Sequence, residues 1–281
     1  MTPPSPSAAP AVSLSHGGSV PQLGLGTWPL TDQTVQPAIL SAFDAGYRHI
    51  DTAVRYGNEN GVGKAIATSG LDRSEVFVTT KLDGAYQGGD RAAGGLTRSL
   101  ERLGLGYVDL LLIHWPLPSR DQFITTWQTF EKLLAAGKAR AIGVSNFKPA
   151  HLDLLLAAAS IVPAVNQVQL SPFTPRHAER KYGLAHGIVT ESYSPLGRGS
   201  ALLTAAPIVQ IADRHGRTPA QIVLRWHVQQ GLVPIPKSAD PIRIRQNIEI
   251  FDFELDDDDL AGISTLDLGP SAGVDSDHEG H

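Results

Sequence analysis

Eight short strand-like segments alternate with helical segments along this chain of 281 residues. The predicted strands are residues 23–26, 47–51, 76–80, 108–113, 139–143, 164–168, 188–191 and 232–235. Several are nearly continuous apolar runs, such as VDLLLI, and such runs are typical of parallel strands buried on both faces. The segments between them place apolar residues at a helical period, for example at Phe123, Trp127, Phe130 and Leu134. The pattern therefore predicts an α/β fold with a parallel sheet.

Both a closed (β/α)8 barrel and an open, doubly wound sheet repeat strand and helix in this way. The glycine-containing turns favour the barrel. The segment GLGTWP begins like a dinucleotide-binding turn, but Pro29 stands where that turn needs a third glycine for close packing of helix and strand. The segment GVGKA lacks the upstream glycine and the Ser or Thr of a phosphate-binding loop. We therefore predict one (β/α)8 TIM barrel over residues 12–268, close to the usual size of about 250 residues.

The two ends of the chain differ in composition from its centre. Residues 1–11 are rich in proline and small polar residues, which predicts a disordered tail. Residues 269–281 are rich in Gly, Ser and Asp and show no period, which predicts an irregular C-terminal tail. Residues 12–14 and 19–20 flank the turn residues His16, Gly17 and Gly18, which predicts a β-hairpin that caps one end of the barrel.

The composition excludes several classes of function. The chain has no cysteine, which rules out thiolate catalysis, iron–sulfur clusters and disulfide scaffolds. With 28 Asp and Glu against 23 Lys and Arg, it lacks the positive charge that nucleic-acid binding requires. No apolar run reaches the length of a membrane span, and the N-terminus does not resemble a signal peptide. We expect a cytoplasmic, monomeric protein that binds neither nucleic acid nor membranes.

Four ionisable residues follow three neighbouring predicted strands. Asp51 ends one strand and Tyr56 lies in the loop after it, whereas Lys81 and His114 follow the next two strands. Taken singly, each has an ordinary explanation as a turn cap, a packing aromatic, a rim charge or a core histidine. The carboxyl ends of barrel strands form the active-site face, so the four side chains are expected to meet there. Their joint occurrence favours a catalytic site.

This set of side chains suits proton transfer to a carbonyl oxygen. A nearby ammonium favours the tyrosinate, so Lys81 is expected to lower the pKa of Tyr56 from about 10. Asp51 would hold Lys81 by an ion pair, and His114 would orient the substrate oxygen. A proton donor without a nucleophile needs a second reactant, and hydride from a nicotinamide cofactor is the simplest one.

Seven segments of the chain resemble one known family. HIDTAVRYGNE, TTKL, LLIHWP, GVSNF, VNQVQLSP, SYSPLGRG and IPKSADPIRIRQN occur in this order over residues 20–268. Together they resemble the aldo-keto reductase superfamily, and in particular its compact bacterial branch, which includes 2,5-diketo-gluconate reductases. The resemblance implies a (β/α)8 barrel that binds NADPH without a Rossmann fold and a catalytic tetrad of Asp51, Tyr56, Lys81 and His114. It also implies reduction of small aldehydes or ketones, with α-dicarbonyls and keto-sugar acids as candidate substrates.

The resemblance further assigns residues to the cofactor and the substrate. These are Ser145, Asn146, Gln167 and Tyr193 for the nicotinamide, Ser194, Leu196 and Gly197 for the pyrophosphate, Lys237, Ser238 and Arg243 for the 2′-phosphate, Gln246 and Asn247 for the adenine, and Trp28 and Trp115 for the substrate pocket. The cations within KSADPIRIR also suit a phosphate monoester on physical grounds, which favours NADPH over NADH.

Two alternative functions stay open. Some members of the superfamily are NADPH-binding, redox-sensing or regulatory modules with slow turnover, although the intact tetrad argues against this role here. A metal-dependent barrel hydrolase is the other alternative, but the chain lacks a His-x-His strand motif and we expect no metal.

Some positions depart from the family pattern. Asp83 stands where the family commonly has Trp, which predicts a more open and polar pocket. Gln169 and Ser171 also differ from the common residues, and Ser271, Asp275 and Ser276 replace tail residues of the family, so the docking of the tail stays undetermined.

Overall fold

The central sheet of the computed structural model has eight parallel strands whose order follows the chain. The model describes residues 9–281 except residue 16. The strands are β3 (Leu25–Gly26), β4 (His49–Asp51), β5 (Phe77–Leu82), β6 (Val108–Ile113), β7 (Ala139–Ser145), β8 (Val165–Gln169), β9 (Val189–Tyr193) and β10 (Val233–Ile235). Each of them overlaps one predicted strand.

The sheet closes on itself between its first and last strands. Gly24 N donates to Pro234 O over 3.1 Å, and Gly26 N donates to Pro236 O over 3.0 Å. These bonds bring β3 against β10 and turn the sheet into a barrel, which confirms the predicted fold class.

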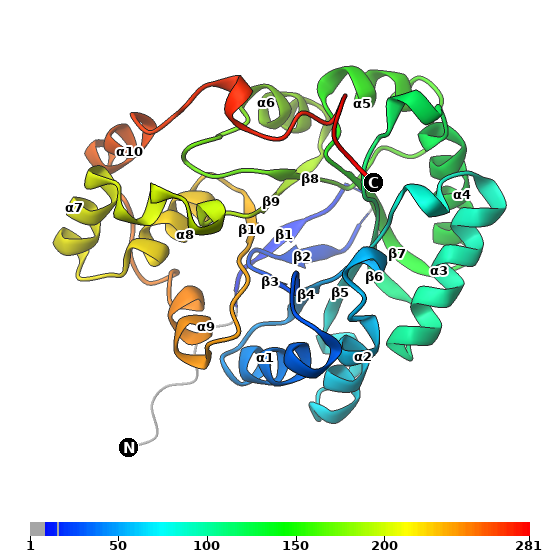
Figure 1. Cartoon of the computed structure of the whole chain (residues 1–281), viewed down its shortest axis with the longest axis horizontal. Coiled ribbons are helices and arrows are strands. Elements are labelled where there is room, and N and C mark those ends of the chain that lie inside the picture. Colours follow the sequence, from blue (N-terminus) through cyan, green and yellow to red (C-terminus); the bar gives the residue numbers. More distant parts are fainter. Residues whose placement is uncertain (1–8, 16) are drawn as a thin grey trace.

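Helices surround the barrel in a ring (Figure 1). They are α1 (Asp32–Asp44), α2 (Glu59–Thr68), α3 (Gly89–Leu103), α4 (Phe123–Ala135), α5 (Pro149–Leu156), α6 (His177–His186), α7 (Ala206–His215), α8 (Pro219–Gln229), α9 (Pro241–Ile248) and α10 (Asp257–Ser264). Thr218 caps α8, and Pro219 is its first residue. Asp256 caps α10, so the acidic residues that follow it form the first turn of that helix. No helix in the described part of the chain is both long and apolar enough to cross a bilayer.

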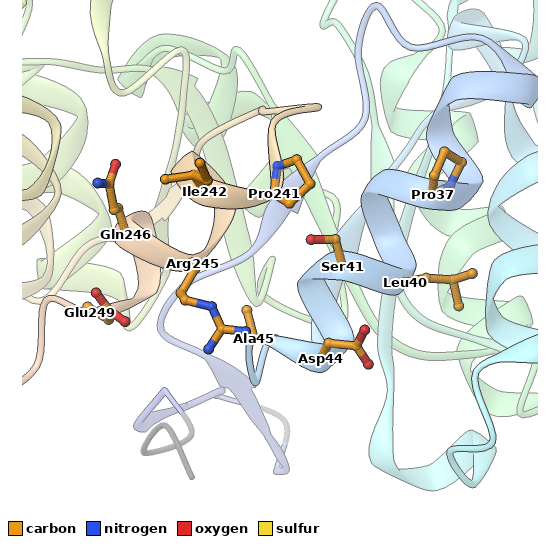
Figure 2. Close-up of a pocket in the computed structure, with 10 residues that line it drawn as sticks. All are labelled: Pro37, Leu40, Ser41, Asp44, Ala45, Pro241, Ile242, Arg245, Gln246 and Glu249. Atoms are coloured by element: carbon orange, nitrogen blue, oxygen red, sulfur yellow. The ribbon is translucent and has the colours of Figure 1, made fainter. Parts of the chain in front are cut away.

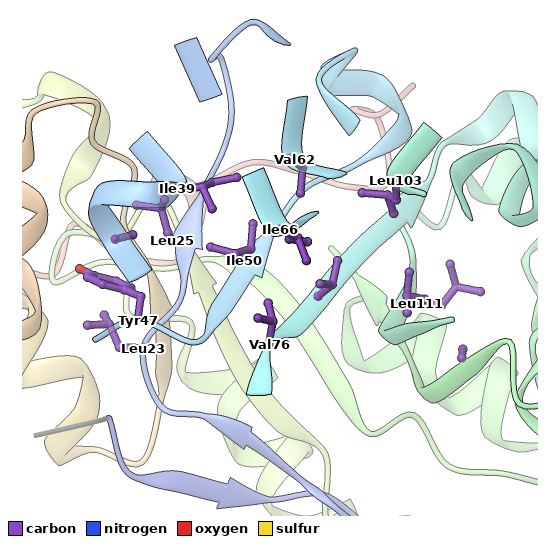
Figure 3. Packing of buried hydrophobic residues seen from close by; sticks show 14 of the residues in the cluster. Leu23, Leu25, Ile39, Tyr47, Ile50, Val62, Ile66, Val76, Leu103 and Leu111 are labelled. Carbon is purple, nitrogen blue, oxygen red and sulfur yellow. The ribbon is translucent and has the colours of Figure 1, made fainter. Parts of the chain in front are cut away.

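An apolar layer between the strands and the helices holds the barrel together. Figure 3 shows side chains from both sides of this layer, among them Ile39 of α1, Ile50 of β4 and Val62 of α2. All three are fully buried. Burial of a side chain of this size stabilises a fold by about 1.5–3 kcal/mol, so the layer is the main source of stability.

A short hairpin covers the end of the barrel at which the strands begin. Its strands β1 (Ala11–Ser13) and β2 (Ser19–Pro21) pair antiparallel. Leu14 and Val20 belong to one buried cluster with Leu110 and Val165 of the barrel strands. The predicted hairpin cap is thus confirmed, although His16 of its turn and residues 1–8 of the predicted tail lie outside the described residues.

Candidate active site

The ends of β4, β5 and β6 bring the four predicted residues of the tetrad together. Lys81 Nζ lies 2.6 Å from Asp51 Oδ1 and 3.4 Å from the Tyr56 hydroxyl. The rings of Tyr56 and His114 meet edge to face, with 5.8 Å between their centroids. The Lys81 side chain is completely buried, so its charge acts on these neighbours with little screening by water.

A buried asparagine that the sequence analysis did not single out fixes the loop of Tyr56. Asn58 Oδ1 accepts a hydrogen bond of 2.8 Å from the hydroxyl of Thr52, the residue that follows Asp51 in the chain. Its Nδ2 donates to the carbonyl oxygens of Thr27 and Leu30, over 3.2 and 2.8 Å. Asn58 therefore ties the loop before α1, which carries Trp28, to the loop that carries Tyr56. The only sequence signal for it is its place two residues after Tyr56, within RYGNE.

Burial and the neighbouring groups shift the pKa values of three members of the tetrad, Tyr56, Lys81 and His114. Burial raises the pKa of Tyr56, and this effect exceeds the opposing effect of the Lys81 ammonium. Lys81 thus acts in the predicted direction, but the net shift of the Tyr56 pKa is upward, because the sequence could not show the burial of the phenol. Burial alone would lower the pKa of Lys81, but Asp51 and Tyr56 together outweigh it, so that pKa is raised. Burial, followed by the charge of Lys81, holds the pKa of His114 well below its usual range, so this imidazole is neutral.

The four residues predicted for the nicotinamide lie beside the tetrad, and hydrogen bonds link them to one another. Asn146 Nδ2 donates to His114 O over 3.0 Å, and the Tyr193 hydroxyl donates to Asn146 Oδ1 over 2.9 Å. The Ser145 hydroxyl donates to the carbonyl oxygen of Gln167 over 2.8 Å. Asn146 has a φ of 64°, a left-handed conformation that asparagine tolerates better than most residues. The ends of β7, β8 and β9 thus form one polar wall next to His114.

The residues predicted for the 2′-phosphate lie at the start of α9. The side chains of Lys237 and Arg243 are exposed, and Ser238 between them is buried. Asp240 caps the helix by accepting hydrogen bonds from the backbone N–H groups of Ile242 and Arg243. Arg243 Nε also lies 3.5 Å from Asp240 Oδ2, so a carboxylate accompanies the two cations, and the 2′-phosphate site stays a prediction.

A large groove lies on the outer wall of the barrel, between α1 and α9 (Figure 2). It has a volume of about 670 Å³, and its walls include Pro37, Ser41, Pro241 and Arg245. Of the predicted cofactor residues, Gln246 alone lines it. The groove is therefore separate from the tetrad, which lies inside the ring of strands.

The C-terminal segment crosses the mouth of the barrel and is fastened on the way. Val274 N donates to Gln169 Oε1 over 2.9 Å. Lys148 Nζ forms ion pairs with Asp275 and Asp277. At the end of the segment, Gly84 N donates to His281 O over 2.9 Å. We call residues 274–281 the tail strap, and these contacts determine the docking that the sequence left undetermined.

The tail strap narrows the space above the tetrad. The ring of His281 packs against those of His114 and Trp115, with centroid distances of 4.9 and 5.8 Å. Asp83 is only 7 % exposed, and its carboxylate caps a 3₁₀ turn by accepting from Ala85 N. The more open and polar pocket predicted at Asp83 stays a prediction. The two tryptophans predicted for the pocket differ in exposure, because Trp115 is 9 % exposed whereas Trp28 is 48 % exposed.

Comparisons with known proteins agree on one family. The model of the aldo/keto reductase family matches residues 22–267. An aldo-keto reductase of Mycobacterium sp. (strain KMS) is 48 % identical, with 95 % of this chain and 96 % of the relative covered. The 2,5-diketo-D-gluconic acid reductase B of Corynebacterium sp. is 46 % identical, covering 92 % and 94 %, and the methylglyoxal reductase DkgA of Escherichia coli is 42 % identical, covering 96 % and 98 %. Among solved structures, a variant of Gox0644 in complex with NADPH superposes with a TM-score of 0.93 at 39 % identity, covering 98 % of this chain and all of the other.

Proposed function

Because the chain belongs to the aldo/keto reductase family and is thus an oxidoreductase, we propose that it reduces small aldehydes and ketones to alcohols, with Tyr56 as the proton donor. The observation that carries this proposal is the chain of contacts from Asp51 through Lys81 to the Tyr56 hydroxyl. It aims a phenol with a neighbouring cation at the mouth of the barrel, where a substrate carbonyl can enter.

Each member of the tetrad has a separate task in this proposal. Tyr56 donates its proton to the carbonyl oxygen as negative charge develops there, a step that contributes roughly 10²- to 10⁴-fold in rate. The Lys81 ammonium stabilises the phenolate that is left, and Asp51 keeps that ammonium in place. His114 is neutral and can donate a hydrogen bond to the same oxygen, which orients the substrate.

The cofactor is NADPH or NADP, which related structures contain in complex. When bound, it supplies the hydride. We propose that Ser145, Asn146, Gln167 and Tyr193 hold the nicotinamide and that Lys237, Ser238 and Arg243 hold the 2′-phosphate. The polar wall beside His114 and the exposed cations at α9 support these assignments. The pyrophosphate would follow Ser194, Leu196 and Gly197, where Ser194 and Gly197 have positive φ angles, and the adenine would lie near Gln246 and Asn247.

For the substrate we propose a small α-dicarbonyl or keto-sugar acid. Two relatives carry names of this kind, a methylglyoxal reductase and a diketo-gluconate reductase. The contact of His281 in the tail strap with the buried Trp115 favours a small substrate, and Trp28 would form the outer edge of the pocket. A cytoplasmic location and a monomeric state remain predictions from the sequence.

A turnover assay tests the proposal. We expect the purified protein to oxidise NADPH in the presence of methylglyoxal, a diketo-gluconate or a reactive aromatic aldehyde, and NADH to support a much lower rate. A protein that binds NADPH tightly but turns over none of a panel of about twenty carbonyl compounds would contradict the proposal and would favour the redox-sensing alternative.

A further inference from the structure

A second set of polar side chains lies inside the barrel, below the tetrad. His49 comes from β4, two residues before Asp51, so both point to the same face of that strand. Gln167 of β8 and Glu191 of β9 are partners in the register of neighbouring strands. Gln167 is 1 % exposed and the other two are not exposed at all. The barrel thus encloses a titratable carboxyl group that the proposed reaction does not use.

One amide group connects this carboxyl group to the tetrad. Gln167 Nε2 lies 2.8 Å from Asp51 Oδ2 and 3.0 Å from Glu191 Oε2. An amide nitrogen carries two N–H bonds, so both are used by the two carboxyl groups. Only the oxygen of the Gln167 amide is left for another partner. Because an Asp51 carboxylate can only accept hydrogen bonds, the nitrogen must face it and the orientation of the whole amide is fixed.

The surroundings keep Glu191 neutral near pH 7. Burial, followed by the charge of Asp51, raises the pKa of Glu191 to about 8, whereas Gln167 and the Lys81 ammonium act in the opposite direction. His49, the other titratable group that faces it, lies with Nε2 4.0 Å from Glu191 Oε1. Burial lowers the pKa of His49 to about 4, so this imidazole is neutral as well.

Each of these two side chains has one polar atom without a hydrogen-bond partner in the described part of the chain. Glu191 Oε1 and His49 Nδ1 are buried without a hydrogen bond there, and His49 Nε2 bonds the Thr79 hydroxyl over 3.0 Å. The backbone of Gly24 lies so close that a side chain at that position would come within 2.7 Å of His49 Nδ1. A charge on Glu191 would therefore find no new partner in this layer and would act on the tetrad above it.

We propose that Glu191 is a positioning residue that acts on Tyr56 through Gln167, Asp51 and Lys81, and that its neutral form supports carbonyl reduction. This inference rests on the proposed function. The neutral acid leaves Asp51 as the single anion beside Lys81. Ionised Glu191 adds a second buried anion near the phenol, which disfavours the developing phenolate and makes Tyr56 a weaker proton donor.

The pH profile of Glu191→Gln tests the proposal. Glutamine has the shape of the neutral acid and cannot ionise. In the natural protein we expect kcat/KM for reduction to fall about five- to tenfold between pH 7 and pH 9, since a single group that titrates near pH 8 is about nine-tenths ionised at pH 9. In Glu191→Gln the fall should be less than twofold. The matched control is Ser192→Ala, which alters the next, equally buried residue of β9 and should keep the fall seen in the natural protein.

A measurement on the natural protein separates this inference from the proposed function. A carboxyl group whose pKa is higher in the folded than in the unfolded state keeps a proton that the unfolded chain has lost. The free energy of unfolding should therefore decline from about pH 5 to pH 8 and level off above, and Glu191→Gln should remove the part of this decline that Glu191 causes. If Glu191→Gln keeps the alkaline fall in kcat/KM, or if its unfolding free energy has the same pH dependence as that of the natural protein, the inference is wrong. Absence of any carbonyl reduction would instead overturn the proposed function.

Discussion

The same eight strands form two very different ends of the barrel. Where the strands begin, Leu14 and Val20 of the hairpin fill the interior with apolar contacts. Where they end, the interior holds the buried ion pair of Lys81 and Asp51, with further polar groups below it. Such an ion pair contributes little net stability, because the cost of removing both charges from water offsets their attraction. The difference teaches that one end of the barrel supplies stability and the other supplies chemistry.

The largest effect is expected from a substitution at the end of the barrel that holds the tetrad. Tyr56→Phe removes only the phenolic hydroxyl, so we expect kcat to fall by roughly 10²- to 10⁴-fold. The free energy of unfolding and the affinity for NADPH should change little, as measured by urea unfolding and by quenching of tryptophan fluorescence. Near-normal turnover by this variant would show that Tyr56 is not the proton donor.

The matching test at the hairpin end should have the reverse outcome. Leu14→Ala creates a cavity between the hairpin and the barrel, and we expect a loss of about 2–5 kcal/mol in the free energy of unfolding. At a temperature well below unfolding, kcat should stay within about twofold. Val12→Ala, at a partly exposed position of the same hairpin, is the control and should cost less. A large loss of kcat in a still folded Leu14→Ala protein would break the division between the two ends.

A smaller effect is expected at the edge of the catalytic end, where the cofactor phosphate would bind. Replacing both Lys237 and Arg243 by Ala should weaken NADPH binding about 10- to 100-fold and leave NADH binding nearly unchanged, since only NADPH carries the 2′-phosphate. Arg245→Ala is a matched control, because it removes a cation from the same helix on the side of the outer groove. Equal losses for both cofactors would exclude a phosphate site here.

The smallest effect concerns the tail strap. Its ion pairs with Lys148 are partly exposed, and such pairs are worth about 0.2–1 kcal/mol. Lys148→Ala should therefore raise KM for the carbonyl substrate by up to about fivefold, with kcat unchanged. High salt should have the same effect on the natural protein and none on the variant. A variant with unchanged KM would show that other contacts, such as that of Gln169 with Val274, are sufficient to hold the strap.

The strands and the tetrad could be predicted because their signals are local. Near-continuous apolar runs such as residues 108–113 indicate buried parallel strands, and Asp51, Lys81 and His114 stand at strand ends that the barrel brings to one face. No contact between distant residues is needed for these inferences.

The features that were missed all depend on contacts between distant parts of the chain. Gln167 meets both Asp51 and Glu191 only through the register of strands and the closure of the barrel. The depth at which Tyr56 is buried, and hence the direction of its pKa shift, depends on how the loops fold around it. His281 reaches His114 because the strap is fastened at several points along its path. The composition of residues 269–281 predicts an irregular segment but does not say where it docks.

The closing seam between β3 and β10 has a consequence for how the barrel opens. Both hydrogen bonds described there run from glycine N–H groups to carbonyl oxygens of Pro234 and Pro236, and proline has no N–H with which to return a bond. The two bonds of the seam therefore run in one direction only, and we expect local fluctuations to part it before other pairs of strands. Amide hydrogen exchange at Gly24 and Gly26 would then be faster than elsewhere in the sheet. Lys237 directly follows this seam. A cofactor bound at Lys237 would therefore slow this exchange, because it would stabilise the closed junction of β3 and β10.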